Sequence, residues 1–300
     1  MANVLTDASA AANLITTAYD LAAWPSLRPE LIFDQFASVR ATNQSHNGSA
    51  VRFTFVSDLA PVTASLAEST DVDSVALSTS TVTLTLAEKG SAVTTTGLAR
   101  GTSFVPLDPV AAERVGFNAG ISMDTLARLA LDGGTNITTL TAALTASDFR
   151  KTDAALKGRF ARAFGDSYIA VIHPDVEYDI RNASDAASWR YFQANNATMG
   201  EGIMRGEIGR FEHFRVVTNP RILTTGSGPT KSYKNFFFGQ EALAKAYSKA
   251  AGYGPYARVE PGPVVDRLKR FVPIGWYWLG AYGVFRQESL QVVNCYSGLN

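Results

Sequence analysis

The chain has 300 residues, and its 27 Lys and Arg balance 27 Asp and Glu, so the formal net charge at pH 7 is zero. Hydrophobic residues make up 46% and charged residues 18%. This composition excludes a disordered chain, a collagen, and a protein that binds nucleic acid through overall positive charge. The charged fraction is below the roughly 25% usual in soluble domains, and zero net charge removes the self-repulsion that keeps proteins monomeric. Both features favour a chain that covers much of its surface with copies of itself.

The net charge of zero is the sum of opposite net charges on the two halves of the chain. Residues 1–150 contain 8 basic and 14 acidic side chains, and residues 151–300 contain 19 and 13, which gives −6 and +6. Lys89 is the only lysine of the first half. Random drift is one interpretation of this split. The other is head-to-tail contact between complementary halves of neighbouring subunits.

The first 49 residues are poorly patterned. Residues 14–24 predict a short helix, which Pro25 and Pro29 end, and residues 31–37 form a second short apolar piece. An extended arm with isolated aromatic residues cannot build a core of its own. We therefore expect it to lie on the rest of the subunit or on a neighbour.

Residues 50–105 predict a long two-stranded excursion with a loose tip. Residues 50–56 and 81–86 alternate apolar and polar side chains at period two, as strands do. Gly90 interrupts the second run, which resumes at 92–96, and the segment 57–80 between the strands is acidic and rich in turn residues. An isolated hairpin is marginal in water, so we expect it to lie across another surface. The candidate contacts with a neighbouring subunit are Asp58, Glu68, Asp71, Asp73 and Lys89.

Residues 106–132 predict a long helix. Asp108 is the expected N-cap, with Pro109 in the first helical position, and Gly133 and Gly134 end the helix. Its expected inward stripe consists of Val110, Arg114, Phe117, Ile121, Leu126, Leu129 and Leu131.

The rest of the chain mixes helices and strands. A helix that starts at Ser147 is expected to turn Phe149, Leu156, Phe160 and Phe164 inward. Strands are predicted over 168–174, 214–218, 236–238, 274–281 and 290–296, and helices over 175–180 and, in an Ala-rich segment, 242–251. Trp276, Tyr277 and Trp278 are interpreted as framework residues of a strand. The alternative is a base-stacking platform for single-stranded nucleic acid.

The sequence contains no recognisable catalytic set. His46, His173 and His213 are far apart, and none has a second histidine at metal-ligand spacing. Motifs of the nucleophile-elbow and phosphate-loop types are absent. Cys295 lies in an apolar run and is interpreted as a small buried hydrophobe. We expect no catalytic, cofactor-binding or metal-binding residues, no secretory signal and no membrane helix. A hydrolase around His173 is the enzymatic alternative.

Three groups of residues and the order of the pieces are similar to a known family. The groups are Ile169–Pro174, Gly206–Gly209 with Phe214–Pro220, and Pro273–Trp276. An extended arm, a long polar hairpin, a long helix and an α+β body resemble the HK97-type major capsid protein of tailed bacteriophages. The C-terminal half resembles the N4-like major capsid subfamily. The similarity covers nearly the whole chain in architecture, and about residues 167–220 and 270–296 in motifs.

The resemblance implies a structural shell protein, not an enzyme, with an α+β HK97-like capsid fold. It implies hexamers and pentamers on an icosahedral lattice around packaged double-stranded DNA, which the shell contacts non-specifically. Scaffolding, portal and decoration proteins would be separate partners, and no membrane would take part. Assembly would occur in the host cytoplasm and the product would be the virion. Another virion component, such as a tail or decoration protein, is the alternative.

The resemblance also implies a division of the chain into five segments. They are an N-terminal arm (1–49), an extended β-hairpin loop (50–105), a peripheral domain with the spine helix (106–164), an axial domain (165–262) and C-terminal strands that return to the peripheral domain (263–300). On this interpretation, the acidic loop of one copy lies on the basic body of the next.

Overall fold

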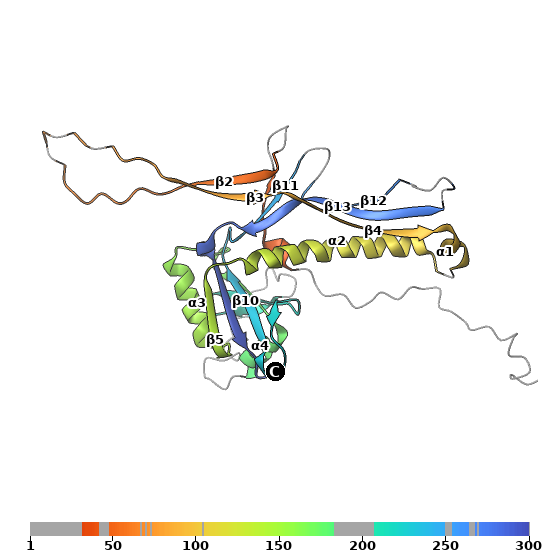
Figure 1. Ribbon diagram of the computed structural model, residues 1–300. Helices are drawn as coiled ribbons and strands as arrows, with labels where there is room; N and C mark the ends of the chain where they lie inside the picture. The colour runs from red at the N-terminus through yellow and green to blue at the C-terminus, as the bar shows by residue number, and fades with distance from the viewer. Residues whose placement is uncertain are drawn as a thin grey trace, which may run out of the picture.

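The computed structural model contains two large β-sheets, a long helix and a hairpin that extends away from both sheets (Figure 1). The structure describes residues 32–41, 48–66, 68–69, 71–72, 74–103, 105–182, 207–249, 254–263, 268 and 270–299. The helix predicted over 14–24 lies outside these residues, as do Asp73 and His46.

The first sheet has five strands and lies along the long helix (Figure 1). Its main path is β1-β11-β13-β12, and β4 pairs with β13 on the edge opposite β12. The strands are β1 (Ser38–Ala41), β4 (Ala87–Thr96), β11 (Leu243–Tyr247), β12 (Arg258–Pro261) and β13 (Phe271–Val284). A short helix, α1 (Gly97–Thr102), connects β4 to the long helix, α2 (Leu107–Asp132).

Helix α2 confirms the predicted helix, but its predicted start and inward stripe are wrong. Pro106 occupies the N-cap position, and Asp108 instead accepts a hydrogen bond of 2.9 Å from the Thr95 hydroxyl. Of the predicted stripe only Leu131 is buried, and Leu129 is 48% exposed. Most buried positions are spaced four residues apart: Ala111, Val115, Ala119, Met123, Ala127 and Leu131. Three of these six positions are alanines, so the buried stripe is less conspicuous in the sequence than the larger apolar side chains beside it.

The second sheet has seven strands and is covered on both faces. Its order is β5-β14-β10-β6-β8-β7, and β9 (Thr224–Thr225) pairs with β10. The other strands are β5 (Ile137–Ala143), β6 (Tyr168–Ile172), β7 (Glu207–Phe211), β8 (Phe214–Thr218), β10 (Ser232–Phe238) and β14 (Leu290–Tyr296). Helices α3 (Ala146–Gly158) and α4 (Pro174–Asn182) cover one face, and the 3-10 helix η1 (Phe33–Phe36) with the end of α2 covers the other. Two further 3-10 helices are η2 (Gly228–Thr230) and η4 (Gln287–Ser289).

Strand β6 shows why the sheet needs both covers. All five of its side chains are buried, with Ala170 and Ile172 in the core under α3 and α4. Ile169 and Val171 belong to the core on the opposite face. A central strand that is buried on both faces has a continuous run of apolar residues. That pattern is the one from which this strand was predicted.

The division of the strands between the two sheets does not follow the boundaries of the expected segments. β13 belongs to the five-stranded sheet, whereas β14 pairs with β10 in the seven-stranded sheet. β5 and α3 also lie with the seven-stranded sheet. No strand was predicted over 137–143, because β5 is an edge strand whose Thr-rich side chains are largely exposed.

Two predictions about the five-stranded sheet are wrong. Within the Ala-rich segment 242–251, where a helix was expected, Leu243–Tyr247 forms strand β11, because β11 lies between β1 and β13 and buries both of its faces. Burial in a sheet overrides the helix propensity of alanine. Gly90 does not interrupt the second run, and β4 continues through it. A side chain at Gly90 would meet the Trp276 carbonyl oxygen at 2.7 Å, so glycine permits this close pairing.

Helix α3 confirms a second predicted helix and corrects one inward residue. Thr145 and Asp148 form a capping box at its start, and Phe149 and Leu156 are fully buried as predicted. The helix ends at Gly158, two residues before Phe160. Phe160 is therefore not part of the inward face, and 92% of its surface is exposed.

Candidate assembly surface

The hairpin is anchored at its base in its own subunit. β2 (Ala50–Val56) and β3 (Thr79–Thr85) pair along seven residues. Phe53 and Leu84 are buried against Ala244 and Ala246 of β11. The ring centroid of Phe285 lies 5.0 Å from that of Phe53 and 4.8 Å from that of Phe55. The expectation that the hairpin needs another surface is thus met at its base by β11 and the end of β13.

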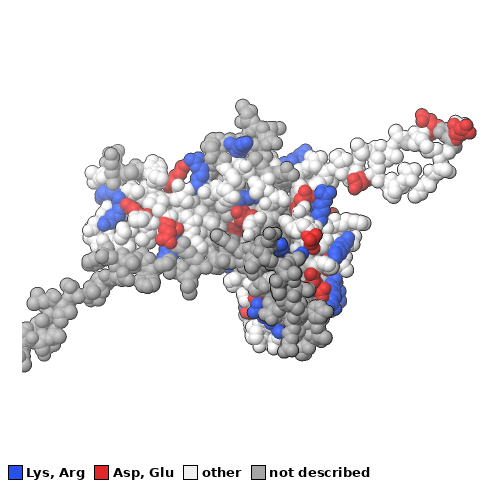
Figure 2. Space-filling model, turned by 180° about the vertical axis from the view of Figure 1, so that it is seen from behind, with Lys and Arg blue, Asp and Glu red and all other residues white. Residues whose placement is uncertain are grey.

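The loop beyond the base is exposed and carries both acids and apolar side chains. Residues 57–78 include no Lys or Arg, and Asp58, Glu68 and Asp71 are all exposed. Figure 2 shows acidic side chains at the far end of the hairpin. Large apolar side chains between 54% and 81% exposed accompany them: Leu59, Val62, Leu66, Val72, Val75 and Leu77. Such a loop has the composition of a segment that is covered by another molecule.

Lys89 does not belong to this loop. It lies on β4 opposite Trp278 of β13, and it is exposed. The structure thus brings Asp58, Glu68 and Asp71 together on one projection and separates Lys89 from them.

A buried cluster of charged groups joins the start of the described chain to both sheets. We call Asp34, Asp124, Arg221, Lys245 and Tyr282 the Asp34–Asp124 joint. Asp34 accepts hydrogen bonds from Lys245 Nζ at 2.8 Å and from the Tyr282 hydroxyl. Asp124 of α2 accepts from the Phe33 backbone N–H at 2.7 Å and from Arg221 Nη1 at 2.8 Å. The joint therefore ties η1 to α2, β11 and β13.

Burial shifts the titration of these groups. It raises the pKa of the Asp124 carboxyl, while the Phe33 N–H and the Arg221 guanidinium act in the opposite direction. Burial also lowers the pKa of Lys245, against the hydrogen bond to Asp34. The pKa of Tyr282 is raised by burial and by the neighbouring Asp34 carboxylate. Sequence patterns do not identify this cluster, because its members are separated by up to 248 positions and form no motif.

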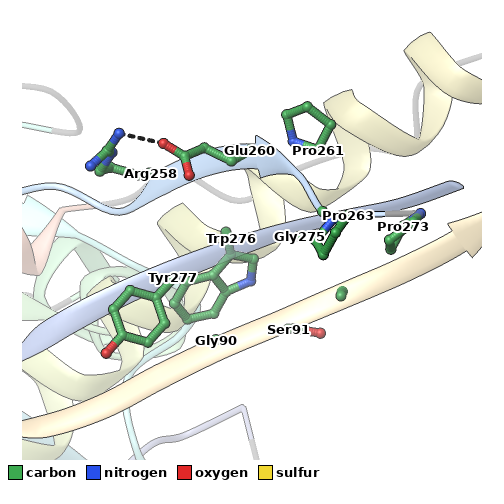
Figure 3. A pocket seen from close by; sticks show the side chains of 12 residues that line it. Gly90, Ser91, Arg258, Glu260, Pro261, Pro263, Pro273, Gly275, Trp276 and Tyr277 are labelled. Atoms are coloured by element: carbon green, nitrogen blue, oxygen red, sulfur yellow. Dashed lines mark hydrogen bonds and ion pairs between the residues drawn. The ribbon is translucent and has the colours of Figure 1, made fainter. Parts of the chain in front are cut away.

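A groove lies on the five-stranded sheet beside β12 and β13 (Figure 3). Its volume is about 660 Å³, and glycines, prolines, Trp276 and Tyr277 make up much of the lining. Among the described residues that line it, the charged ones are Arg258 and Glu260, and they form an ion pair with each other. Without a histidine, a cysteine or a second carboxylate in its lining, the groove has no acid–base pair.

Trp276 and Trp278 are framework residues, as predicted. Trp276 and Trp278 are buried on the side of β13 that packs on α2. Trp276 Nε1 donates a hydrogen bond of 2.7 Å to Asn118 Oδ1. Rings held in this way are not available for stacking on bases.

His173 is held by the backbone. Its Nδ1 accepts a hydrogen bond of 3.1 Å from the Asp175 N–H, the ring donates to the Pro220 carbonyl, and it lies 4.6 Å from the Tyr233 ring. Burial lowers its pKa. Both ring nitrogens are thus engaged by groups of the same subunit, and Nδ1 also lies 3.3 Å from Asp175 Oδ2. Cys295 is buried, as predicted, and burial raises the pKa of its thiol to about 12.

Neither a metal-binding cluster nor a membrane-spanning helix is found in the described ranges. No group of three or more His, Cys, Asp and Glu residues there has the geometry to hold a metal ion. No helix there is both long and apolar enough to span a membrane.

Solved structures with a similar fold include capsids and heads of bacteriophages. The capsid of Ralstonia phage GP4 is 15% identical, with a TM-score of 0.74, over 94% of this chain and 95% of that chain. The capsid of cyanophage Pam1 is 12% identical, with a TM-score of 0.75, over 99% and 100%. The head of Helicobacter pylori bacteriophage KHP40 is 13% identical, with a TM-score of 0.73, over 100% of both chains. The fold is therefore the α+β HK97-type fold of shell-forming proteins.

The family model of phage capsid proteins matches residues 110–289. The chain therefore belongs to the phage capsid protein family, a family of structural proteins of the virion. A comparison with curated proteins finds no match. The protein is a major capsid protein that builds the shell.

Proposed function

We propose that copies of this chain form hexamers and pentamers that close an icosahedral shell around double-stranded DNA. The observation that carries the proposal is the hairpin, whose base is packed in its own subunit and whose acidic and apolar loop extends from the body (Figure 1). A loop of this kind is stabilised when a second copy covers it. A subunit that reaches over its neighbour in this way links one copy to the next around a ring.

The sheets suggest how the subunit is divided. The five-stranded sheet with α2 would form the peripheral domain, and the seven-stranded sheet with α3 and α4 the axial domain. This division moves β5, α3 and β14 from the peripheral segments expected from sequence to the axial domain. Residues 1–49 would be the N-terminal arm. We place the chain in the N4-like subfamily on the motifs Ile169–Pro174, Phe214–Pro220 and Pro273–Trp276.

The further partners follow from the same role. Scaffolding, portal and decoration proteins would be separate chains, DNA would be contacted non-specifically, and assembly would take place in the host cytoplasm. The chain would have no enzymatic activity, which the backbone hydrogen bonds of His173 support.

Electron microscopy of the chain expressed alone tests the proposal. We expect closed shells or free capsomers. A ring or tube of fixed diameter, or binding only to preformed shells, would favour a tail or decoration protein instead. A monomer at high concentration would contradict the proposal.

The acidic loop provides a second test. Reversing Asp58, Glu68 and Asp71 to lysine should impair assembly, because these exposed acids would then repel the basic surfaces that they are expected to meet. The matched control replaces them with Asn, Gln and Asn, which removes the charge without reversing it. Normal shells from the reversed variant would exclude the electrostatic part of the proposal.

A further inference from the structure

Phe160 has an unusual backbone conformation and an unusual exposure. It follows α3 with φ of 56°, in the left-handed region that glycine normally occupies. The N–H of Phe160 bonds to the Lys157 carbonyl and the N–H of Ala161 to the Leu156 carbonyl, at 3.0 and 3.1 Å. These two bonds define a helix end at which glycine is the favoured residue. The chain instead holds a phenylalanine there, with 92% of its surface in solvent.

The fold gains nothing evident from this arrangement. A bulky residue with positive φ is strained, and an exposed ring adds no core packing that would offset the strain. Phe149 and Leu156, which lie in α3 and precede Phe160, already fill the core under the helix. Backbone strain that is not offset by contacts within the monomer is typical of residues that have a function.

The surroundings of Phe160 favour a protein partner. Exposed basic residues on α3 and the turn after it are Arg150, Lys151, Lys157 and Arg162. Acids interrupt them, since Asp148 pairs with Lys151 at 3.1 Å and Asp153 with Lys157 at 2.7 Å. The carboxylates neutralise part of the basic charge and so weaken attraction to a phosphate backbone, whereas a mixed protein surface accommodates both signs. An aromatic anchor with basic neighbours is a frequent centre of protein interfaces.

The direction of the hairpin indicates which protein that is. The hairpin leaves the body on the side that carries α3 (Figure 1), and Figure 2 shows Lys and Arg side chains on that side of the body below the hairpin. A second copy covered by the hairpin therefore faces α3. We propose that Phe160 is an anchor residue that inserts into the adjacent copy of this chain within a capsomer. This inference rests on the proposed function and assigns a second contact to the same neighbour.

Replacing Phe160 with glycine distinguishes a role in contact between subunits from a role in folding. In Phe160→Gly the left-handed backbone becomes unstrained, so we expect the thermal midpoint of the dissociated subunit to stay constant or rise. The critical concentration for assembly, measured by light scattering and sedimentation, should rise about tenfold or more. Phe160→Tyr keeps the ring and should assemble at the wild-type concentration.

Glu241→Gly is the matched control, because Glu241 also has positive φ, at 60°, and lies outside α3. It should relieve comparable strain without raising the critical concentration. Wild-type assembly by Phe160→Gly, or a fall in its thermal midpoint, would overturn the inference and leave the proposed function intact. Absence of shells and capsomers from the wild-type chain would overturn the proposed function, and this inference with it.

Discussion

Removal of the Asp124 carboxylate tests whether the Asp34–Asp124 joint holds the subunit together. Asp124 is 1% exposed and accepts hydrogen bonds from the Phe33 and Asp34 N–H groups and from Arg221. In Asp124→Ala the Phe33 N–H and one face of the guanidinium lose their partner in a site with almost no access to water. Both groups then retain the cost of desolvation without the compensating bond.

The magnitude follows from this loss. Breaking a buried ion pair by removing one partner costs about 3–5 kcal/mol. Arg221 keeps its hydrogen bonds to the Thr125 hydroxyl and the Ile121 carbonyl, so the lower end applies. With an unfolding entropy of about 2.1 cal/mol/K per residue, a loss of about 3 kcal/mol corresponds to a fall of about 5 °C in Tm for a chain of this size. Asp124→Asn keeps an acceptor for the Phe33 N–H, and we expect a smaller fall.

Urea unfolding of the dissociated subunit, followed by tryptophan fluorescence, measures the effect. The control is Glu212→Gln, which weakens the ion pair of 2.9 Å between Glu212 and the exposed Arg150. Surface pairs contribute about 0–1 kcal/mol, so the control should unfold almost like the wild type. Equal midpoints for Asp124→Ala and the control would refute the reasoning, because the joint would then add no more than a surface pair.

Three further predictions concern single residues. The lowered pKa of His173 means that its contribution to stability is complete above its ordinary value of 6.5 and is lost as the pH falls through the folded-state value. His173→Asn should therefore flatten the decline in urea midpoint between about pH 7 and pH 5, and an unchanged decline would contradict this. The Cys295 thiol, with its pKa raised from 9.0 to about 12, should react with iodoacetamide at pH 8 on the order of a thousandfold more slowly in the native than in the unfolded chain; similar rates would exclude its burial. In Gly239→Ala the new Cβ would lie 2.2 Å from the Arg162 carbonyl oxygen, so the free energy of unfolding should fall by about 1–3 kcal/mol. Gly158→Ala is the control, because its Cβ would lie in open space, and this variant should be as stable as the wild type or more stable.

The sequence was most informative where one pattern decided the structure. Period-two alternation located β2 and β3, and the apolar run 168–172 located a strand buried on both faces. Gly133 and Gly134 marked the end of α2. These signals are local, so no knowledge of the partner surface was required.

The errors occurred where tertiary contacts outweighed local preference. The alanines of β11 have helical propensity, yet β1 and β13 enclose them as a strand. Helix α2 turns small residues toward the sheet, and its large apolar side chains therefore misled the assignment of its face. The Asp34–Asp124 joint depends on side chains from five segments, η1, α2, the loop after β8, β11 and β13, and no local sequence pattern brings these together. Phe160 was predicted inward because the helical pattern was continued past Gly158.

The charge split between the halves has an explanation within one subunit. Asp34, Asp124 and Asp132 of the acidic half pair with Lys245, Arg221 and Lys234 of the basic half, at 2.8, 2.8 and 2.6 Å. Because β4 pairs with β13 and β5 with β14, the two halves are interleaved and do not form separate surfaces. These ion pairs between the acidic and the basic half therefore join α2 and η1 to the second half of the same subunit. Asp58, Glu68 and Asp71 lie on the exposed loop, and within the described part of the chain no ion pair joins them to a basic residue. We expect these three acids to be the part of the charge split that serves contact with a neighbouring copy.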